Sequence, residues 1–249
     1  MARSIAGNLF ATAAVSAFIS SFPVATGAHA FGGEPQDVWH GPYLGGHVGW
    51  ASVDSDLAFR APGAPVGSAF DSSLSGDGFA GGAQVGFNHQ IGMLVLGVEA
   101  DITFPQSTDS VTFAPAPGVS AEFQEEADFI GTVRGRVGAA VDNAFLYFTG
   151  GYAWGQFDRT IILNPSFPTS SFDDTSTSSG YALGGGGELS LGTVMGAPMS
   201  AKVEYLYMDF GETTVATPTA GFVATTTQFD TDIQQIRAGL NVQLGGLLD

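Results

Sequence analysis

One pattern recurs along this chain: stretches of about ten residues in which apolar side chains alternate with small or polar ones. The clearest occurrence is at 132–154, where two such stretches are separated only by Asp142 and Asn143. Alternation with a period of two residues is typical of β-strands whose two faces meet different surroundings. Beyond residue 30, no apolar run has the length of a membrane-spanning helix. Any membrane insertion of the processed chain must therefore use strands.

The alternating stretches predict eight strands, and the segments between them are of two kinds. Tight turns at Gly92 and at Asp142-Asn143 and a slightly longer turn at Pro198 lie on one side, while long segments rich in Ser, Gly, Asp and Pro, such as Pro62 and Pro65, lie on the other. This combination is typical of outer-membrane barrels. We therefore predict an all-β fold, an eight-stranded antiparallel transmembrane β-barrel with short periplasmic turns and four long external loops. We expect strands at 43–53, 78–91, 93–104, 122–140, 144–157, 178–191, 201–207 and 232–244, and loops at 55–77, 105–121, 158–177 and 211–228. Both faces of 144–157 carry aromatic residues, so the pattern does not say which face points inward.

The first thirty residues have the features of a secretory signal peptide. Arg3 provides a charged start, an apolar core follows, and Ala28-His29-Ala30 forms an A-x-A cleavage site. We expect cleavage after Ala30, a periplasmic lead at 31–41 and the barrel at 42–249. A membrane anchor is the alternative, but the apolar run is shorter than the roughly 20 residues that a bilayer requires.

Eight charged residues fall on strand faces opposite the apolar faces. A charge that faces lipid near the membrane midplane costs about 2–4 kcal/mol for Arg or Lys, so we expect this shared face to line the lumen. An eight-stranded barrel is just wide enough for side chains to fill its interior. We therefore expect an ion-pair network that plugs the lumen, with a polar conduit as the alternative. The eight are Glu99, Asp101, Arg134, Arg136, Glu188, Lys202, Glu204 and Arg237.

Composition and motifs argue against several other functions. The chain has 24 acidic and seven basic residues and a net charge of −17, which is unfavourable for binding nucleic acid. The carboxylates lack a nearby nucleophile, so we predict no catalytic residue and no enzyme. The histidines His40, His47 and His89 have no metal-ligand spacing, and there is no cysteine, so we predict neither a metal nor a cofactor. Ligation of haem iron by His40 and His47 stays open as an alternative.

Ten aromatic residues lie mostly near the expected strand ends, where aromatic girdles mark membrane–water boundaries. Phe129, Phe145 and Phe157 are among the ten, and we assign the girdle to Tyr43, Trp50, Phe87, Phe104, Trp154, Tyr205 and Tyr207.

Several segments together resemble a known family. These are WHGPYLGGHVG at 39–49, GGAQVGFNHQIG at 81–92, VEAD at 98–101, VRGRVG at 133–138, FLYFTGGYAWG at 145–155, AKVEYLYMDFG at 201–211 and IRAGLNVQL at 236–244. In order and spacing the chain resembles the porin-like outer-membrane β-barrel family of alphaproteobacterial surface antigens, which includes hemin-binding surface proteins. The resemblance implies roles in envelope integrity and surface interactions, without enzymatic activity. A narrow channel for small solutes and a hemin-binding receptor are the alternatives.

The same resemblance implies a set of partners: outer-membrane lipid, lipopolysaccharide and the barrel-assembly machinery. Such chains commonly end on an aromatic residue that this machinery recognises, whereas this one ends on Asp249. Carboxylates in the expected external loops would repel the phosphates of lipopolysaccharide unless divalent cations bridge them. These carboxylates are Asp56, Asp71, Asp77, Asp109, Asp173, Asp174 and Glu212, with only Arg60 and Arg159 as counter-charges.

Overall fold

The computed structural model describes residues 38–60, 70–106, 108–116, 119–164, 170–194, 196–217 and 225–244. The chain divides into two units, Met1–Glu34 and Pro35–Asp249, and all described residues belong to the second. The expected signal peptide, its cleavage site and most of the 31–41 lead lie outside the described residues, as do Pro62 and Pro65.

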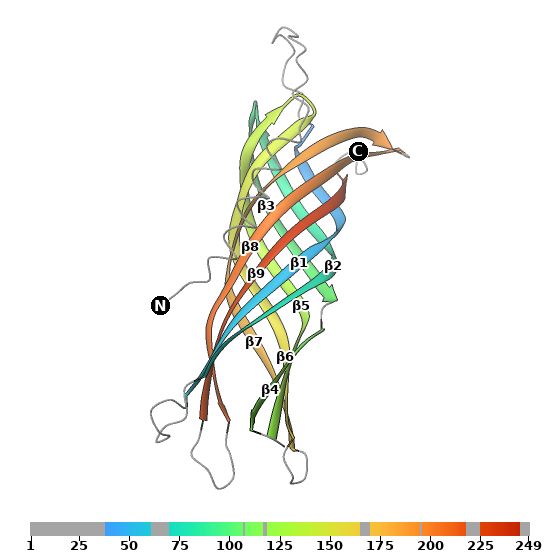
Figure 1. Ribbon diagram of the computed structural model, residues 1–249. Coiled ribbons are helices and arrows are strands. Elements are labelled where there is room, and N and C mark those ends of the chain that lie inside the picture. The colour runs from blue at the N-terminus through green and yellow to red at the C-terminus, as the bar shows by residue number, and fades with distance from the viewer. Residues whose placement is uncertain are drawn as a thin grey trace, which may run out of the picture. The chain divides into compact units, whose positions relative to one another are not determined.

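The described part of the chain is built from strands (Figure 1). Within it, no helix is long and apolar enough to cross a membrane. The strands are β1 (Gly41–Arg60), β2 (Phe70–Ile91), β3 (Leu94–Gln106), β4 (Thr108–Ala116), β5 (Val119–Val141), β6 (Ala144–Asn164), β7 (Ser170–Val194), β8 (Ala197–Thr217) and β9 (Thr225–Gln243).

Antiparallel pairing closes these strands into a ring. Their order is β3-β2-β1-β9-β8-β7-β6-β5-β4, and an additional pairing of β3 with β5 joins the two ends. β3 and β4 pair with successive parts of β5, from Leu94↔Ala139 to Thr103↔Ile130 and then from Thr108↔Glu126 onward. They therefore occupy one position in the ring, which confirms the predicted eight-stranded antiparallel barrel.

Tight turns join the strands at the end where the described chain begins. Gly92 and Asp142 have φ values of 60° and 53°, which favour a glycine or an aspartate in a two-residue hairpin turn. Leu244 N, just past β9, donates a hydrogen bond of 2.8 Å to Pro42 O near the start of β1. Both ends of the described barrel therefore lie on the side of the short turns, which is the periplasmic side in barrels of this type.

The strands are longer than the side-chain pattern predicts, and the expected loop bounds are wrong. Strand pairing continues to Phe59↔Phe70 in the first hairpin and to Leu163↔Ser170 in the third, within segments that we expected as loops. Pro105 lies inside β3, opposite Ala80. The reason is that backbone hydrogen bonds hold an antiparallel ladder whatever its side chains, so the ladder can continue where apolar and polar residues no longer alternate regularly.

Inward and outward faces alternate along the strands wherever the structure describes their side chains. In β3, Val95, Glu99 and Asp101 are buried, while Leu96 and Val98 between them are exposed. The structure also assigns β6, whose faces the sequence left open: Phe145, Tyr147, Thr149, Ala153 and Phe157 are buried, while Leu146, Phe148 and Tyr152 are exposed on the outer face. Exposed apolar side chains thus cover the outer surface, as a lipid environment requires.

Candidate functional site

The eight charged residues assigned to the lumen are brought together inside the barrel. They come from β3, β5, β7, β8 and β9, and the side chain of each is buried. Strand register places opposite charges face to face, at Glu99↔Arg134, Glu188↔Lys202 and Glu204↔Arg237. With four cations and four carboxylates, this set has no formal net charge. We call it the ionic network.

Glu99 is the centre of the ionic network because its carboxylate contacts all four cations. Its oxygens lie 2.6 Å from Arg134 Nη2 and 2.9 Å from Arg136 Nη1. Lys202 Nζ lies 2.9 Å from both oxygens, and Arg237 Nη2 completes the set at 3.5 Å. One side chain on β3 therefore links cations carried by β5, β8 and β9.

Two further carboxylates pair with the two arginines nearest the loop side. Asp101 lies 2.8 Å from Arg134 and 3.0 Å from Arg237, and it accepts a hydrogen bond of 2.6 Å from Thr132 Oγ1. Glu204 lies 3.2 Å from Arg134 Nη1, and its other oxygen accepts a hydrogen bond of 2.7 Å from Arg237 Nε. Each buried charge thus has several partners, which offsets the cost of removing it from water.

Glu188 extends the ionic network toward β9 and β2. It accepts hydrogen bonds from Arg136 Nη2 at 2.8 Å, Ser200 Oγ at 2.5 Å and Asn241 Nδ2 at 2.7 Å. Asn241 Oδ1 in turn accepts a hydrogen bond of 2.7 Å from Gln84 Nε2. Neutral polar side chains therefore continue the hydrogen bonding beyond the last carboxylate.

His47 lies at the end of this neutral branch. Its ring nitrogens lie 2.6 Å from Gln84 Oε1 and 3.0 Å from Thr103 Oγ1, and the side chain is buried. Alternation along β1 was enough to predict that His47 lies on the inner face. Its partners lie on β2 and β3, so the sequence around His47 could not predict them.

Aromatic rings surround Arg136. Its guanidinium carbon lies 4.2 Å from the centroid of Tyr147 and 5.2 Å from that of Phe145, which are cation–π distances. The Tyr43 hydroxyl accepts a hydrogen bond from Arg136 Nη1 and donates one of 2.8 Å to Glu99 Oε2. Tyr43 is only 1 % exposed, so its assignment to the outer aromatic girdle is wrong.

Phe145 and Phe157 are also inside the barrel, although they are among the ten aromatic residues near the expected strand ends. For Tyr43 and Phe157 the reason is a glycine at a neighbouring inner position, Gly86 and Gly155, which leaves room for the aromatic ring. At Gly86, for example, an added Cβ would collide with the Tyr43 ring. At such positions a neighbouring side chain therefore occupies the space that a side chain in place of the glycine would take.

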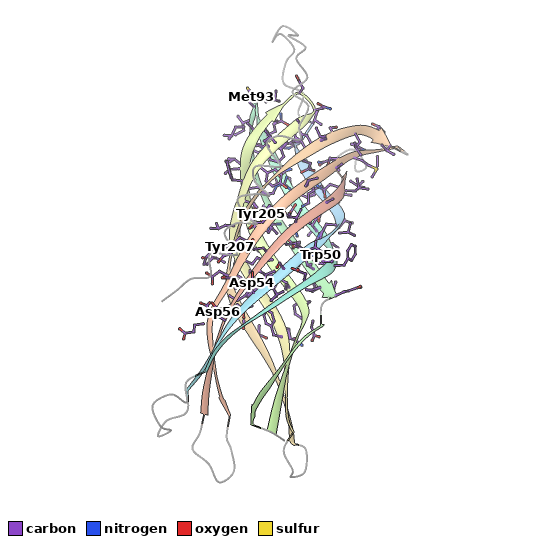
Figure 2. All side chains as sticks on the ribbon, in the orientation of Figure 1. Trp50, Asp54, Asp56, Met93, Tyr205 and Tyr207 are labelled. Atoms are coloured by element: carbon purple, nitrogen blue, oxygen red, sulfur yellow. The ribbon has the colours of Figure 1, made fainter. Side chains whose placement is uncertain are left out.

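The other girdle residues lie on the outer surface. Trp50 is 57 % exposed, Phe87 and Phe104 are exposed, and Trp154, Tyr205 and Tyr207 are half-buried. Figure 2 shows Tyr205, Tyr207 and Trp50 between Met93, at the end with the short turns, and Asp54 and Asp56, toward the opposite end. The Tyr207 hydroxyl donates a hydrogen bond of 2.7 Å to Asp232 Oδ1.

Two layers of buried apolar residues lie on either side of the ionic network. The periplasmic apolar layer contains Trp39, Val95, Ala140, Phe145 and Tyr147. The external apolar layer contains Ala51, Ala80, Ile130, Ala153, Phe157, Ala182, Met208, Phe210 and Ile233. Trp39 precedes β1, and its backbone N–H donates a hydrogen bond of 3.0 Å to Gln90 Oε1.

Beyond the girdle, carboxylates form two rows across neighbouring strands. Register aligns Asp54, Asp232 and Asp209 in one row, and Asp56, Asp230 and Glu212 in the next. Burial and the neighbouring carboxylates Asp77, Asp232 and Asp56 raise the pKa of Asp54. Asp56, Asp77 and Glu212 are exposed and belong to strands rather than loops, while the side chains of Asp71, Asp109, Asp173 and Asp174 lie outside the described residues.

No group of three or more His, Cys, Asp or Glu side chains in the described ranges is arranged to hold a metal ion. His40 and His47, the pair considered for haem iron, point to opposite faces of the barrel wall: His47 is buried and His40 is exposed. Instead, His40 lies beside His89, with ring centroids 5.1 Å apart. No local spacing could have indicated this pair, because it depends on the register of β1 and β2.

Three comparisons with known proteins agree with this architecture. The family model of the outer membrane protein beta-barrel domain matches residues 11–243. The 31 kDa outer-membrane immunogenic protein of Brucella melitensis is 29 % identical over 245 residues, which is 94 % of each chain. A 22 kDa outer membrane protein of Rhizobium leguminosarum is 30 % identical over 177 residues, covering 71 % of this chain and 67 % of that one. Among solved structures, the outer membrane protein OprG of Pseudomonas aeruginosa has a TM-score of 0.51 and 14 % identity, over 81 % of this chain and 96 % of that one.

Proposed function

Because the chain belongs to the outer membrane protein β-barrel family, and so to the outer membrane, we propose that it serves as a structural, surface-exposed element of the bacterial envelope with a closed lumen. Its similarity to an outer-membrane immunogenic protein of Brucella and an outer membrane protein of Rhizobium confirms the resemblance drawn from the sequence. In this proposal the barrel contributes to envelope integrity, and its external hairpins meet the surroundings.

The observation that carries the closed-lumen proposal is the stacking of three layers inside the barrel. The ionic network is buried, and each of its charged groups contacts groups of opposite charge or hydrogen-bonding side chains. The periplasmic and external apolar layers flank it. A solute would have to break charge-assisted hydrogen bonds in a medium of low dielectric constant, where each is strong.

Conductance measurement tests this proposal against the narrow-channel alternative. We expect the protein, refolded and inserted into planar bilayers, to give no stepwise conductance, and vesicles that contain it to exclude small sugars. Heat-modified gel mobility of the same samples verifies that the barrel is folded. Reproducible conductance steps from folded protein would favour the channel and reject the closed lumen.

A deletion strain tests the envelope role separately. We expect the deletion strain to be more sensitive to detergents and to release periplasmic protein. The parental gene should reverse both effects. A barrel in which the external hairpins 55–77 and 158–177 are shortened to tight turns should restore integrity while losing surface interactions. Failure of the parental gene to restore integrity would remove the envelope role without bearing on conductance.

We propose in addition that the rim of the barrel contacts lipopolysaccharide through divalent cations. The two carboxylate rows lie just beyond the girdle, where direct contact with lipid phosphates would be repulsive, and hard cations favour oxygen ligands. Chelator treatment of outer-membrane vesicles should then raise protease cleavage within 55–77 and 158–177. Equal cleavage with and without chelator would leave these segments simply solvated. We also propose that the barrel-assembly machinery inserts this chain into the outer membrane.

A further inference from the structure

The exposed pair His40 and His89 lies on the outer surface at the periplasmic end of the barrel. Inner and outer positions alternate along β1 and β2: Trp39 and Asn88 are buried, while His40 and His89 beside them are exposed. Their ring centroids are 5.1 Å apart with planes at 65°, and Phe87 lies 5.9 Å from His40. Neither ring belongs to the ionic network or to the carboxylate rows.

The backbone fixes these two side chains opposite each other. Gly41 pairs with Asn88 in the ladder of β1 and β2, and the Trp39 backbone N–H binds the side chain of Gln90. His40 and His89 lie between these two cross-strand contacts. Directly opposite residues of an antiparallel pair have Cβ atoms about 4.5–5.5 Å apart, so their side chains extend side by side.

This geometry matches that of two imidazoles that share one metal ion. With metal–nitrogen bonds of about 2.0–2.1 Å and tetrahedral angles, the two ring centroids lie roughly 5 Å apart. Here the spacing is already present, and only rotation of the rings is required to turn a nitrogen of each toward a common point. Both side chains are exposed, and the second torsion of a histidine has a broad preference, so this rotation breaks no buried contact.

We propose that His40 and His89 form a two-histidine site for a divalent transition-metal ion, such as Zn²⁺, Cu²⁺ or Ni²⁺, at the periplasmic rim. Imidazole is a ligand that suits these metals, whereas the carboxylates at the opposite end of the barrel suit Mg²⁺ and Ca²⁺. Water completes the coordination, because the described residues offer no third protein ligand. The bound ion joins the segment before β1 to the end of β2.

The test uses the full chain, purified without a polyhistidine tag and refolded in detergent micelles. Zn²⁺ is titrated by calorimetry in excess Mg²⁺, which occupies the carboxylates. We expect one Zn²⁺ per chain in the parent. His40→Gln or His89→Gln should each weaken binding at least about tenfold, since even groups behind the ligands commonly contribute 10–100-fold. The double variant should not bind.

Cu²⁺ provides a direct signature of the ligands. Pulsed electron paramagnetic resonance should detect two equatorial imidazole nitrogens in the parent and one in each single variant. Because the site exists only in the folded barrel, Zn²⁺ should raise the unfolding midpoint of the parent and not of the double variant.

Two matched controls make the result decisive. The double variant retains His47 and every carboxylate, so binding that persists in it would overturn the proposal. A second variant, Asp54→Asn with Asp56→Asn, removes two carboxylates and keeps both histidines. Unchanged Zn²⁺ affinity in this variant supports the histidine site, whereas a loss equal to that of the double histidine variant rejects it.

Discussion

Replacement of Glu99 by Gln is the sharpest perturbation of the ionic network. The substitution retains the volume of the side chain and removes the single charge that contacts Arg134, Arg136, Lys202 and Arg237. Three carboxylates would then face four cations. The amide also keeps only one accepting oxygen, so an N–H group would point at a cation.

The expected loss of stability follows from burial rather than from packing. Removal of one partner from a buried ion pair leaves an uncompensated charge and costs about 3–5 kcal/mol. No cavity forms, so no further loss is expected from the change of shape. At about 1.4 kcal/mol per tenfold change, the unfolding equilibrium constant should rise by roughly two to three and a half orders of magnitude.

Equilibrium urea unfolding in phospholipid vesicles measures this loss, with tryptophan fluorescence and gel mobility as independent readouts. The midpoint should fall with an unchanged denaturant slope, since the surface exposed on unfolding stays the same. Adding Lys202→Met to Glu99→Gln restores neutrality, and the cost of the double variant should be clearly less than the sum of the two single costs.

Asp128→Asn provides the matched control, because Asp128 is exposed and accepts a single hydrogen bond from Gln156. Its cost should lie within about 0–1 kcal/mol. If Glu99→Gln costs no more than Asp128→Asn, the ionic network does not stabilise the barrel, and the argument from burial fails.

Three further predictions concern other parts of the barrel. Arg237→Ala should lower stability by roughly 3–5 kcal/mol, because it removes a buried partner of Glu204 and Asp101, whereas Arg159→Ala should cost about 0–1 kcal/mol; equal shifts of the heat-induced gel-mobility transition would contradict this. The raised pKa of Asp54 means that the folded barrel holds this proton more tightly than the unfolded chain, so the associated stability is present at low pH and is lost as pH rises through the folded pKa. Asp54→Asn should therefore stabilise the barrel by a few tenths of a kcal/mol at pH 7 and not at pH 3, as measured by urea unfolding. Trp39→Ala should lower the free energy of unfolding by about 3–5 kcal/mol, because it leaves a cavity in the periplasmic apolar layer. A loss below about 1 kcal/mol would show that Trp39 packs only loosely.

The sequence predicts the barrel wall better than it predicts the contents of the lumen. In 94–104 one face is apolar and the other carries Glu99 and Asp101, so alternation alone assigns inside and outside. In 144–157 both faces carry aromatic residues, and the choice depends on which neighbouring strands leave space. Tyr43 lies on the same face of β1 as His47, so alternation could have placed its ring inside the barrel, and Gly86 opposite leaves room for it.

The same division explains the two remaining differences. Hairpin lengths beyond the girdle depend on backbone pairing, which continues where apolar and polar residues no longer alternate regularly. The pairing of His40 with His89 depends on the register of β1 against β2. Alternation predicts which face of a strand each residue lies on, but not which residue of the next strand lies opposite. Composition and periodicity therefore predict the strands of the barrel and which face of each is apolar. The contacts between strands determine which side chains form the ionic network and the histidine pair.

The central position of Glu99 has a consequence for how the barrel can form. Arg134 and Arg136 lie on β5, which pairs directly with β3, whereas Lys202 and Arg237 lie on β8 and β9, which do not neighbour β3. These two cations reach Glu99 across the lumen only when the ring is closed. A partly formed sheet would keep the pairs on adjacent strands but lack the contacts across the lumen, and its incompletely compensated charges would carry a solvation cost into the bilayer. The charges of the ionic network are therefore fully compensated only in the closed barrel. Closure and membrane insertion should accordingly occur as a single cooperative transition rather than strand by strand.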